Sequence, residues 1–168
     1  MNILYLAYAD LNQALQQKQI DAMSQSEPQS TQAINKGFGV EITKAYDTPM
    51  GEPIRALVMT EKLYKEKPDV ARRVIECFVD ATKTFLDKPD QAEKYVRESL
   101  FKGQLTHEDY KDAMSNAGFT YDITVEHVQV TTDLMVKHGV GKMSKAPKAS
   151  DWVKLDLLQR AKKDLGVK

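Results

Sequence analysis

The spacing of apolar positions changes about one third of the way along the chain. Up to residue 59, short apolar runs of strand length alternate with short segments that have the period of a helix. Helices are expected to begin near Asp10 and Ser26, both of which are residue types that cap helices. Strands are expected at 3–7, 20–24, 40–45 and 54–59. This alternation is typical of a parallel α/β sheet.

The remaining two thirds of the chain have the period of helices throughout. Pro68 and Pro89 stand where two helices would begin, and a first turn tolerates the missing N–H of proline. Val70, Val74 and Phe78 would then share one helical stripe. Thr106 and Asp109 have the spacing of a capping box, so another helix is expected to begin there. The predicted fold class is therefore α/β with a helix-rich C-terminal part.

Composition and charge exclude several classes of partner. Hydrophobic residues make up 42% of the 168 positions, and Lys+Arg and Asp+Glu are equal at 24 each. A balanced charge gives no overall field toward nucleic acid, so no nucleic-acid partner is expected. No apolar run approaches the length of a membrane span. The first residues lack the basic start and the long apolar stretch of a signal peptide.

Motifs for catalysis and metal binding are missing. The sequence has no glycine-rich phosphate loop, no paired cysteines and no His-Glu-x-x-His. His107, His127 and His138 fall on separate expected elements, where surface or cap roles are favoured over a shared metal site. Cys77 lies among apolar residues of an expected helix, which favours an inert, buried thiol. We therefore expect no catalytic residue, no metal and no cofactor.

Polar residues gather where the second expected strand gives way to a helix. Ser24, Gln25 and Ser26 lie in this connection, and ligands of open parallel sheets bind beyond the carboxyl ends of strands. Free N–H groups at a helix start favour an anion. Glu27 would oppose an anion if it faced the ligand, and a role at the helix dipole or beside a cation is favoured. The alternative, that Ser26 is only a cap and Gln25 only a loop residue, stays open.

A second candidate site lies in the breaker-rich segment 48–53. Thr48 offers a hydroxyl there, and Gly51 permits the dihedral angles of a hinge. The alternative is a plain loop. The expected ligand-binding residues are thus Ser24, Gln25, Ser26, Glu27, Thr48 and Gly51.

Several short pieces occur in a characteristic order: Gln19-Ile-Asp-Ala22, Glu27-Pro28, Gly37-Phe-Gly39 and Arg55-Ala-Leu-Val58. Their order and spacing resemble the second half of solute-binding proteins of ABC importers, in the nitrate/sulfonate/taurine and thiamine-precursor binding family. The resemblance implies a partial type II periplasmic-binding-protein fold. Residues 1–47 would belong to the distal lobe, 48–53 would form the hinge crossing, and 54–168 would complete the first lobe and add bracing helices.

The resemblance also implies a function. The chain would be the extracytoplasmic, periplasmic solute-binding component of an ABC importer, or a fragment of one, with the membrane permease as its partner. Its solute would be small and anionic or heteroaromatic. Because the leading units of both lobes would be missing, we expect exposed sheet edges and a homo-oligomer formed through them. Gln29 stands where the family often has an aromatic residue, which weakens the case for an aromatic wall.

Two other functions are compatible with the sequence. One is an enzyme of the same fold, the pyrimidine-precursor synthase branch, which resembles this chain less because it is rich in cysteine. The other is a non-catalytic helical interaction module, or a truncated remnant, without ligand binding. The interaction module would carry extra exposed apolar stripes on the last helices.

Overall fold

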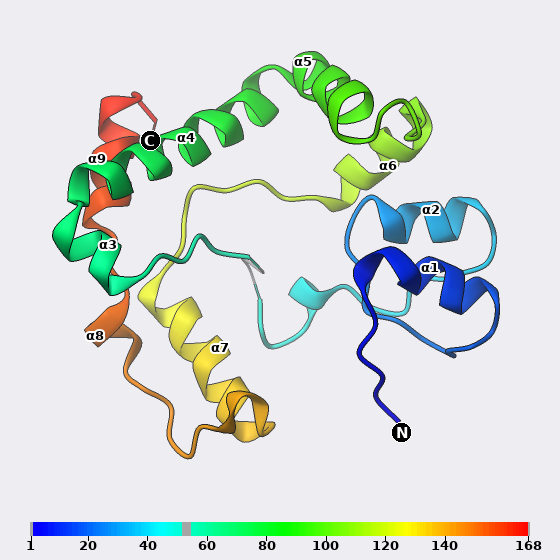
Figure 1. The fold of residues 1–168 in the computed structure, drawn as a ribbon, viewed down its shortest axis with the longest axis horizontal. Helices are drawn as coiled ribbons and strands as arrows, with labels where there is room; N and C mark the ends of the chain where they lie inside the picture. Colours follow the sequence, from blue (N-terminus) through cyan, green and yellow to red (C-terminus); the bar gives the residue numbers. More distant parts are fainter. Residues whose placement is uncertain (1, 52–54, 168) are drawn as a thin grey trace. The chain divides into compact units, whose positions relative to one another are not determined.

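The computed structural model describes residues 2–51 and 55–167, which form helices joined by turns and extended segments (Figure 1). In chain order the elements are α1 (Tyr8–Gln16), α2 (Gln29–Asn35), η1 (Ala45–Asp47), α3 (Glu61–Glu66), α4 (Pro68–Asp87), α5 (Pro89–Lys94), η2 (Tyr95–Leu100), α6 (His107–Asn116), α7 (Val125–Lys137), η3 (Val140–Lys142), α8 (Ala149–Trp152) and α9 (Asp156–Asp164). They divide into two compact units, Met1–Ile42 with Pro89–Gly118 and Thr43–Lys88 with Phe119–Lys168.

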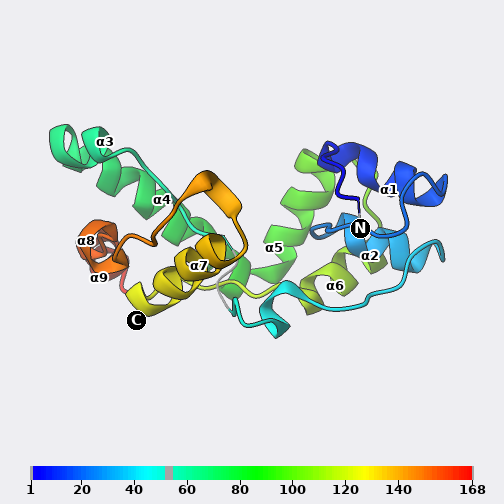
Figure 2. The same cartoon turned by 90° about the horizontal axis from the view of Figure 1, so that it is seen from below.

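The first unit has a core of small side chains between helices that contact one another. Helix α2 packs against both α1 and α6, and Figures 1 and 2 show α1 and α2 side by side. Ala14, Ala33 and Ala113 are buried at these contacts, together with Leu105 and Tyr110. Alanine allows backbones to approach closely, so short helices can pack although few large side chains are buried.

Helix α5 continues directly into η2, a single π-helical stretch. The chain then reverses through Lys102 and Gly103, which both have positive φ, at 50° and 78°. Thr106 caps the next helix, because its hydroxyl accepts a hydrogen bond from the Asp109 N–H at 3.0 Å. This turn brings the start of α6 back beside α5.

The second unit is built on the pair α4 and α9, with α3 also packed on α4. Ala71 and Ala161 are fully buried in this unit, and Phe85 stacks on Phe119 with 4.8 Å between ring centroids. Helix α7 packs against α8, where Gln129 accepts a hydrogen bond from the Ala149 N–H at 2.7 Å. The side chains of Thr60 and Thr124 cap α3 and α7.

The helix-rich part of the expected fold is confirmed, whereas the α/β part needs correction. No strand occurs within residues 2–51 and 55–167, so the strands expected at 3–7, 20–24 and 40–45 are not formed, nor is one at 55–59. Ile54, Glu52 and Pro53 lie outside the described residues. A strand requires a neighbouring strand to pair its N–H and C=O groups, and an apolar run cannot supply that neighbour by itself.

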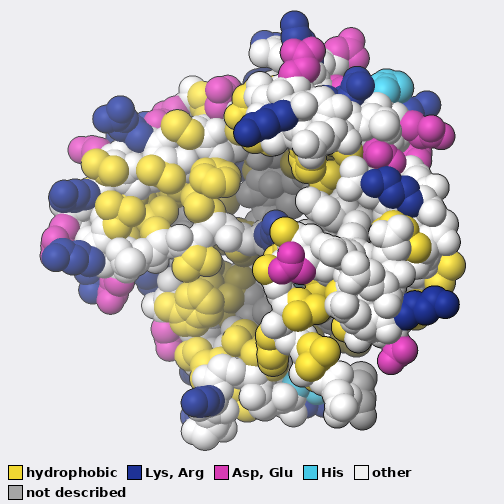
Figure 3. All heavy atoms as spheres, turned by 45° about the vertical axis from the view of Figure 1, so that its right-hand side comes forward, with side chains coloured by type: hydrophobic (Ala, Val, Ile, Leu, Met, Phe, Trp, Pro, Cys, Tyr) yellow, Lys and Arg dark blue, Asp and Glu magenta, His cyan; other side chains and the backbone are white. Residues whose placement is uncertain are grey.

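The apolar side chains of these segments are consequently exposed. Tyr5 is 95% exposed, Val40 85% and Val58 81%. Hydrophobic side chains are visible at many places on the face drawn in Figure 3. Native surfaces often expose single apolar residues, but several in one extended segment are unusual.

Two helix starts and one burial prediction also need correction. Asp10 lies in the first turn of α1 rather than at its cap, and Ser26 does not cap α2, whose N-cap is Pro28. Cys77 is exposed, because α4 turns Ala71 and Val79 inward and carries Val74 and Phe78 on its exposed side. Among the described helices, none combines the length and apolar character of a membrane crossing.

Candidate functional site

The connection between α1 and α2 is held in place by Gln25. Its Nε2 donates hydrogen bonds to the Tyr8 carbonyl oxygen at 3.2 Å and to Asn12 Oδ1 at 3.3 Å. Its Oε1 accepts from the N–H of Ser26 at 3.0 Å. The carboxamide of Gln25 therefore fastens the loop to α1, and both of its polar atoms already have protein partners.

Glu27 serves the start of α2 and links it to α6. One carboxylate oxygen accepts a hydrogen bond from the Thr31 N–H at 3.2 Å, and the other accepts from Asn116 Nδ2 at 3.4 Å. A carboxylate in this position satisfies a free N–H of the first turn and complements the helix dipole, as the sequence suggested. The structure places Ser24, Gln25, Ser26 and Glu27 in one loop, in which Ser24 is exposed and Ser26 is half-buried.

Thr48 and Gly51 lie together in the second unit, in a tight turn that follows η1. The Thr48 hydroxyl donates to the Ala45 carbonyl oxygen at 2.6 Å and accepts from the Met50 N–H at 3.3 Å. Gly51 has φ of +66° and donates its N–H to the Thr48 carbonyl oxygen at 3.0 Å. The positive φ explains the choice of glycine.

A groove of about 370 Å³ runs between α1 and α2 in the first unit. Five of its lining side chains are carboxamides, and only one residue is charged. The lining consists of Tyr8, Ala9, Asn12, Gln13, Gln16, Gln29, Gln32, Lys36 and Phe38. Asn12 holds the two walls together, because its Nδ2 donates to the Gln29 carbonyl oxygen at 2.9 Å.

None of the four groove glutamines is among the site residues expected from the sequence, although a signal was available. Ala9, Asn12, Gln13 and Gln16 follow the i, i+3, i+4, i+7 spacing of one helical face. This spacing normally predicts an apolar face that packs in a core, whereas here most of its residues are polar but uncharged. Neither an apolar stripe nor a charged motif therefore marks it in the sequence.

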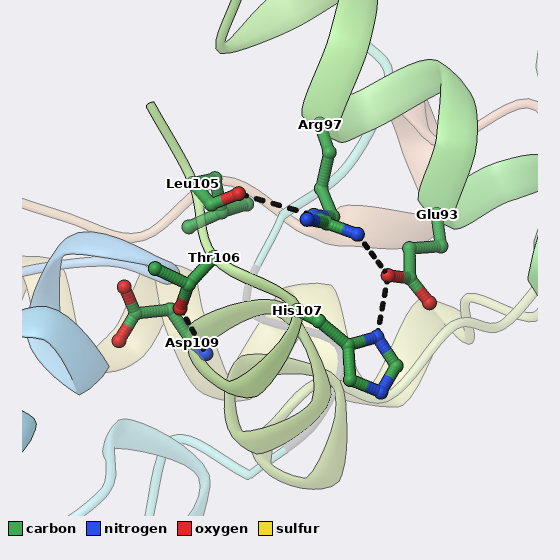
Figure 4. A network of polar contacts seen from close by, with 6 residues as sticks. All are labelled: Glu93, Arg97, Leu105, Thr106, His107 and Asp109. Atoms are coloured by element: carbon green, nitrogen blue, oxygen red, sulfur yellow. Dashed lines mark hydrogen bonds and ion pairs between the residues drawn. The ribbon is translucent and has the colours of Figure 1, made fainter. Parts of the chain in front are cut away.

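A polar network joins α5 and η2 to the start of α6 (Figure 4). Glu93 Oε1 lies 2.6 Å from His107 Nδ1 and accepts a hydrogen bond from Arg97 at 2.8 Å. Arg97 Nε also donates to the carbonyl oxygen of the buried Leu105 at 3.1 Å. The hydrogen bond from His107, followed by that from Arg97, holds the pKa of Glu93 below its usual range.

Nearby in the same unit, burial raises the pKa of the Tyr110 hydroxyl, and the Glu93 charge acts in the same direction. Within the described residues no cluster of three or more His, Cys, Asp or Glu side chains could hold a metal ion. The hydrogen bonds of the network tie α5 and η2 to the start of α6.

Comparison with known proteins identifies the family. The family model described as the NMT1-like family matches residues 1–98, more than half of the chain. The chain belongs to the NMT1-like family. This family is related to the solute-binding proteins of ABC transporters, in agreement with the resemblance noted in the sequence. Searches of curated proteins and of solved structures found no match. The part matched by the NMT1-like model includes the 24–27 loop, the α1/α2 groove, Thr48 and Gly51.

Proposed function

We propose that this NMT1-like protein is the extracytoplasmic solute-binding component of an ABC importer, without enzymatic activity. The observation that carries the proposal is the family match over residues 1–98, since that family is related to such proteins. The permease in the membrane would be its partner, and the periplasm its location. The solute would be small and anionic or heteroaromatic.

Ser24, Gln25, Ser26 and Glu27 would form a solute site in the first unit. The hydrogen bonds of Gln25 to α1 support this assignment, because a binding loop must be held in position before the ligand arrives. Ser24 and Ser26 would donate hydroxyls to the solute. Gln25 would position the loop, and Glu27 would fix the start of α2.

Thr48 and Gly51 would hold a turn of the second unit. The hydroxyl of Thr48 already has two backbone partners, so its contribution would be to hold the turn. Gly51 would supply the dihedral freedom for a hinge, in keeping with its positive φ.

A ligand panel tests the proposal. Thermal unfolding would be followed with taurine, nitrate, bicarbonate, benzoate or an aminopyrimidine, because a ligand that binds the folded chain raises its stability with concentration. We expect one class to raise the unfolding temperature, and Ser24→Ala or Ser26→Ala to weaken its binding by about 1–3 kcal/mol. Ser144→Ala, an exposed serine of the second unit, is the control. No stabilisation by any of the five would contradict the proposal.

One observation favours a second candidate function, that of a helical interaction module. Helix α4 exposes Val70, Val74 and Phe78, with Phe78 54% exposed, on one stripe. The sequence predicted such stripes on the last helices, whereas this one lies on α4, and an exposed apolar stripe there is still a surface on which a partner can dock. Phe78→Asp would abolish binding of a partner protein in this case, whereas solute binding by the 24–27 loop would be unchanged.

A further inference from the structure

The α1/α2 groove is lined by uncharged polar residues to a greater extent than the chain as a whole. Charged residues make up 29% of the chain, yet Lys36 is the only charged residue among the nine that line the groove. Alternating Lys and Glu is one pattern typical of a solvated helical face. Glutamines from both walls occupy the groove instead.

The glutamines of the groove come from both helices. Gln13 and Gln16 come from α1, and Gln29 and Gln32 are three residues apart on α2, so both walls present carboxamides to the groove. Asn12 uses both polar atoms inside the protein, donating to the Gln29 carbonyl oxygen and accepting from Gln25. It therefore positions the walls and leaves recognition to the glutamines.

Each glutamine side chain offers one acceptor and two donor hydrogens. Within the described residues, no protein partner is seen for the carboxamides of Gln13, Gln16, Gln29 and Gln32. A set of neutral groups that both donate and accept matches a ligand whose own groups do the same. It does not match an anion, which only accepts hydrogen bonds. Among the lining residues, a carboxylate would find Lys36 as its one cationic partner.

Aromatic residues complete the lining of the groove. Tyr8 is 63% exposed and Phe38 is half-exposed, so their rings can contact a ligand. An aromatic ring packs on the C–H face of a sugar, while the hydroxyls around that sugar's rim donate and accept hydrogen bonds. A volume of about 370 Å³ is at the lower end of the range for small-molecule sites.

We propose that the groove between α1 and α2 binds a neutral saccharide of one or two rings through Gln13, Gln16, Gln29 and Gln32, with Tyr8 and Phe38 packing on the rings. The site is additional to the anionic or heteroaromatic solute site, and it stands whether or not that site exists. Binding is weak, because the groove is open to solvent.

Nuclear magnetic resonance on the full chain tests the assignment. Maltose, cellobiose and N,N′-diacetylchitobiose are added separately, and the side-chain NH₂ signals of the four glutamines are followed. We expect saturable shifts of these signals with at least one of the disaccharides and none with glycerol or sodium sulfate at equal concentration. Shifts that never saturate, or that occur only outside the groove, overturn the proposal.

Two variants make the test specific. Gln16→Ala with Gln32→Ala removes one carboxamide from each wall, and we expect at least a tenfold loss of affinity. Gln104→Ala, an exposed glutamine of the same unit outside the groove, should bind like the wild type. Equal affinity of all three proteins overturns the proposal, provided that the double variant melts within a few degrees of the wild type. If it does not, Gln16→Glu, which keeps the side-chain length, replaces it.

Two further additions separate the saccharide from other ligands. Tetraglycine offers peptide groups that also donate and accept, and a saturable response to it but to no disaccharide overturns the assignment in favour of a peptide. Taurine reports on the proposed solute site at 24–27. A response to taurine there without a response to sugars in the groove leaves the proposed function standing and removes this inference alone.

Discussion

Glu93 and His107 are joined side chain to side chain, with 2.6 Å between Oε1 and Nδ1, across the reversal that leads from α5 to α6. The contact lowers the pKa of the Glu93 carboxyl, and Arg97 adds to the effect. Since an unfolded chain lacks these partners, the carboxyl binds a proton more readily when the protein is unfolded.

We predict that His107→Ala raises the pKa of Glu93 toward its ordinary value. A titration of the Glu93 side-chain carbon signal measures this pKa directly, and His138→Ala in the second unit is the control. The stabilisation from Glu93 is complete above the ordinary glutamate pKa of about 4.3 and is lost as the pH falls through the lowered value. An unchanged titration midpoint in His107→Ala would show that the contact has no electrostatic effect.

We predict that Arg97→Ala destabilises the first unit by about 1–3 kcal/mol, because the carbonyl oxygen of the buried Leu105 loses its side-chain donor. Arg97→Lys keeps a positive charge near Glu93 but does not reproduce the Nε–H donor, so it should restore only part of the loss. Urea unfolding measures both. Full rescue by lysine would mean that charge alone matters.

Local signals predicted much of the helical part. Pro68 and Pro89 open α4 and α5, and Thr106 caps α6, because each of these effects depends only on residues within one turn. Pairing of extended segments depends on a partner elsewhere, and an apolar run such as 40–45 contains no information on whether one is present. The α/β expectation failed for this reason.

The candidate site was predictable to the same local extent. The composition of the 24–27 loop indicates hydrogen bonding, but it cannot show that Gln25 turns its carboxamide toward Asn12 and Tyr8. Lys162 is a further case, since a lysine on a helix is usually solvated and this side chain is buried beside Asp122. Burial of a lysine depends on which helix packs on which, and the local pattern does not encode this.

We predict that Asp122→Ala destabilises the second unit by about 1–2 kcal/mol, because it leaves the Lys162 ammonium, now 2.7 Å from Asp122, without its anionic partner. Lys162→Met removes the charge together with the need for a partner and should cost less. Denaturant unfolding of both variants gives the comparison. A larger loss for Lys162→Met would contradict the prediction.

We predict that Ala161→Leu destabilises the second unit by about 1–3 kcal/mol, since Ala161 on α9 is fully buried in the unit where α9 packs on α4 and a larger side chain would push elements apart. Ala81→Leu on the exposed side of α4 adds the same volume and should be nearly neutral. Thermal and urea unfolding test the pair. Equal effects at the two positions would contradict the packing described.

The last prediction concerns the extended segment that contains Val40 and Ile42, which are 85% and 83% exposed. Backbone groups of an unpaired extended segment can pair with another chain, and apolar side chains strengthen that association. We predict that the double change Val40→Lys and Ile42→Lys lowers self-association and leaves the free energy of unfolding within about 0.5 kcal/mol of the wild-type value, because neither side chain is buried.

Glu41→Lys, on an exposed residue between them, adds the same two units of positive charge without removing an apolar side chain, so it separates charge repulsion from the loss of apolar contact. Sedimentation velocity over a range of concentrations measures association, and urea unfolding measures stability. Equal association of the double variant and Glu41→Lys would assign the effect to charge, and a loss of more than about 1 kcal/mol would show that the segment is packed against the rest of the unit.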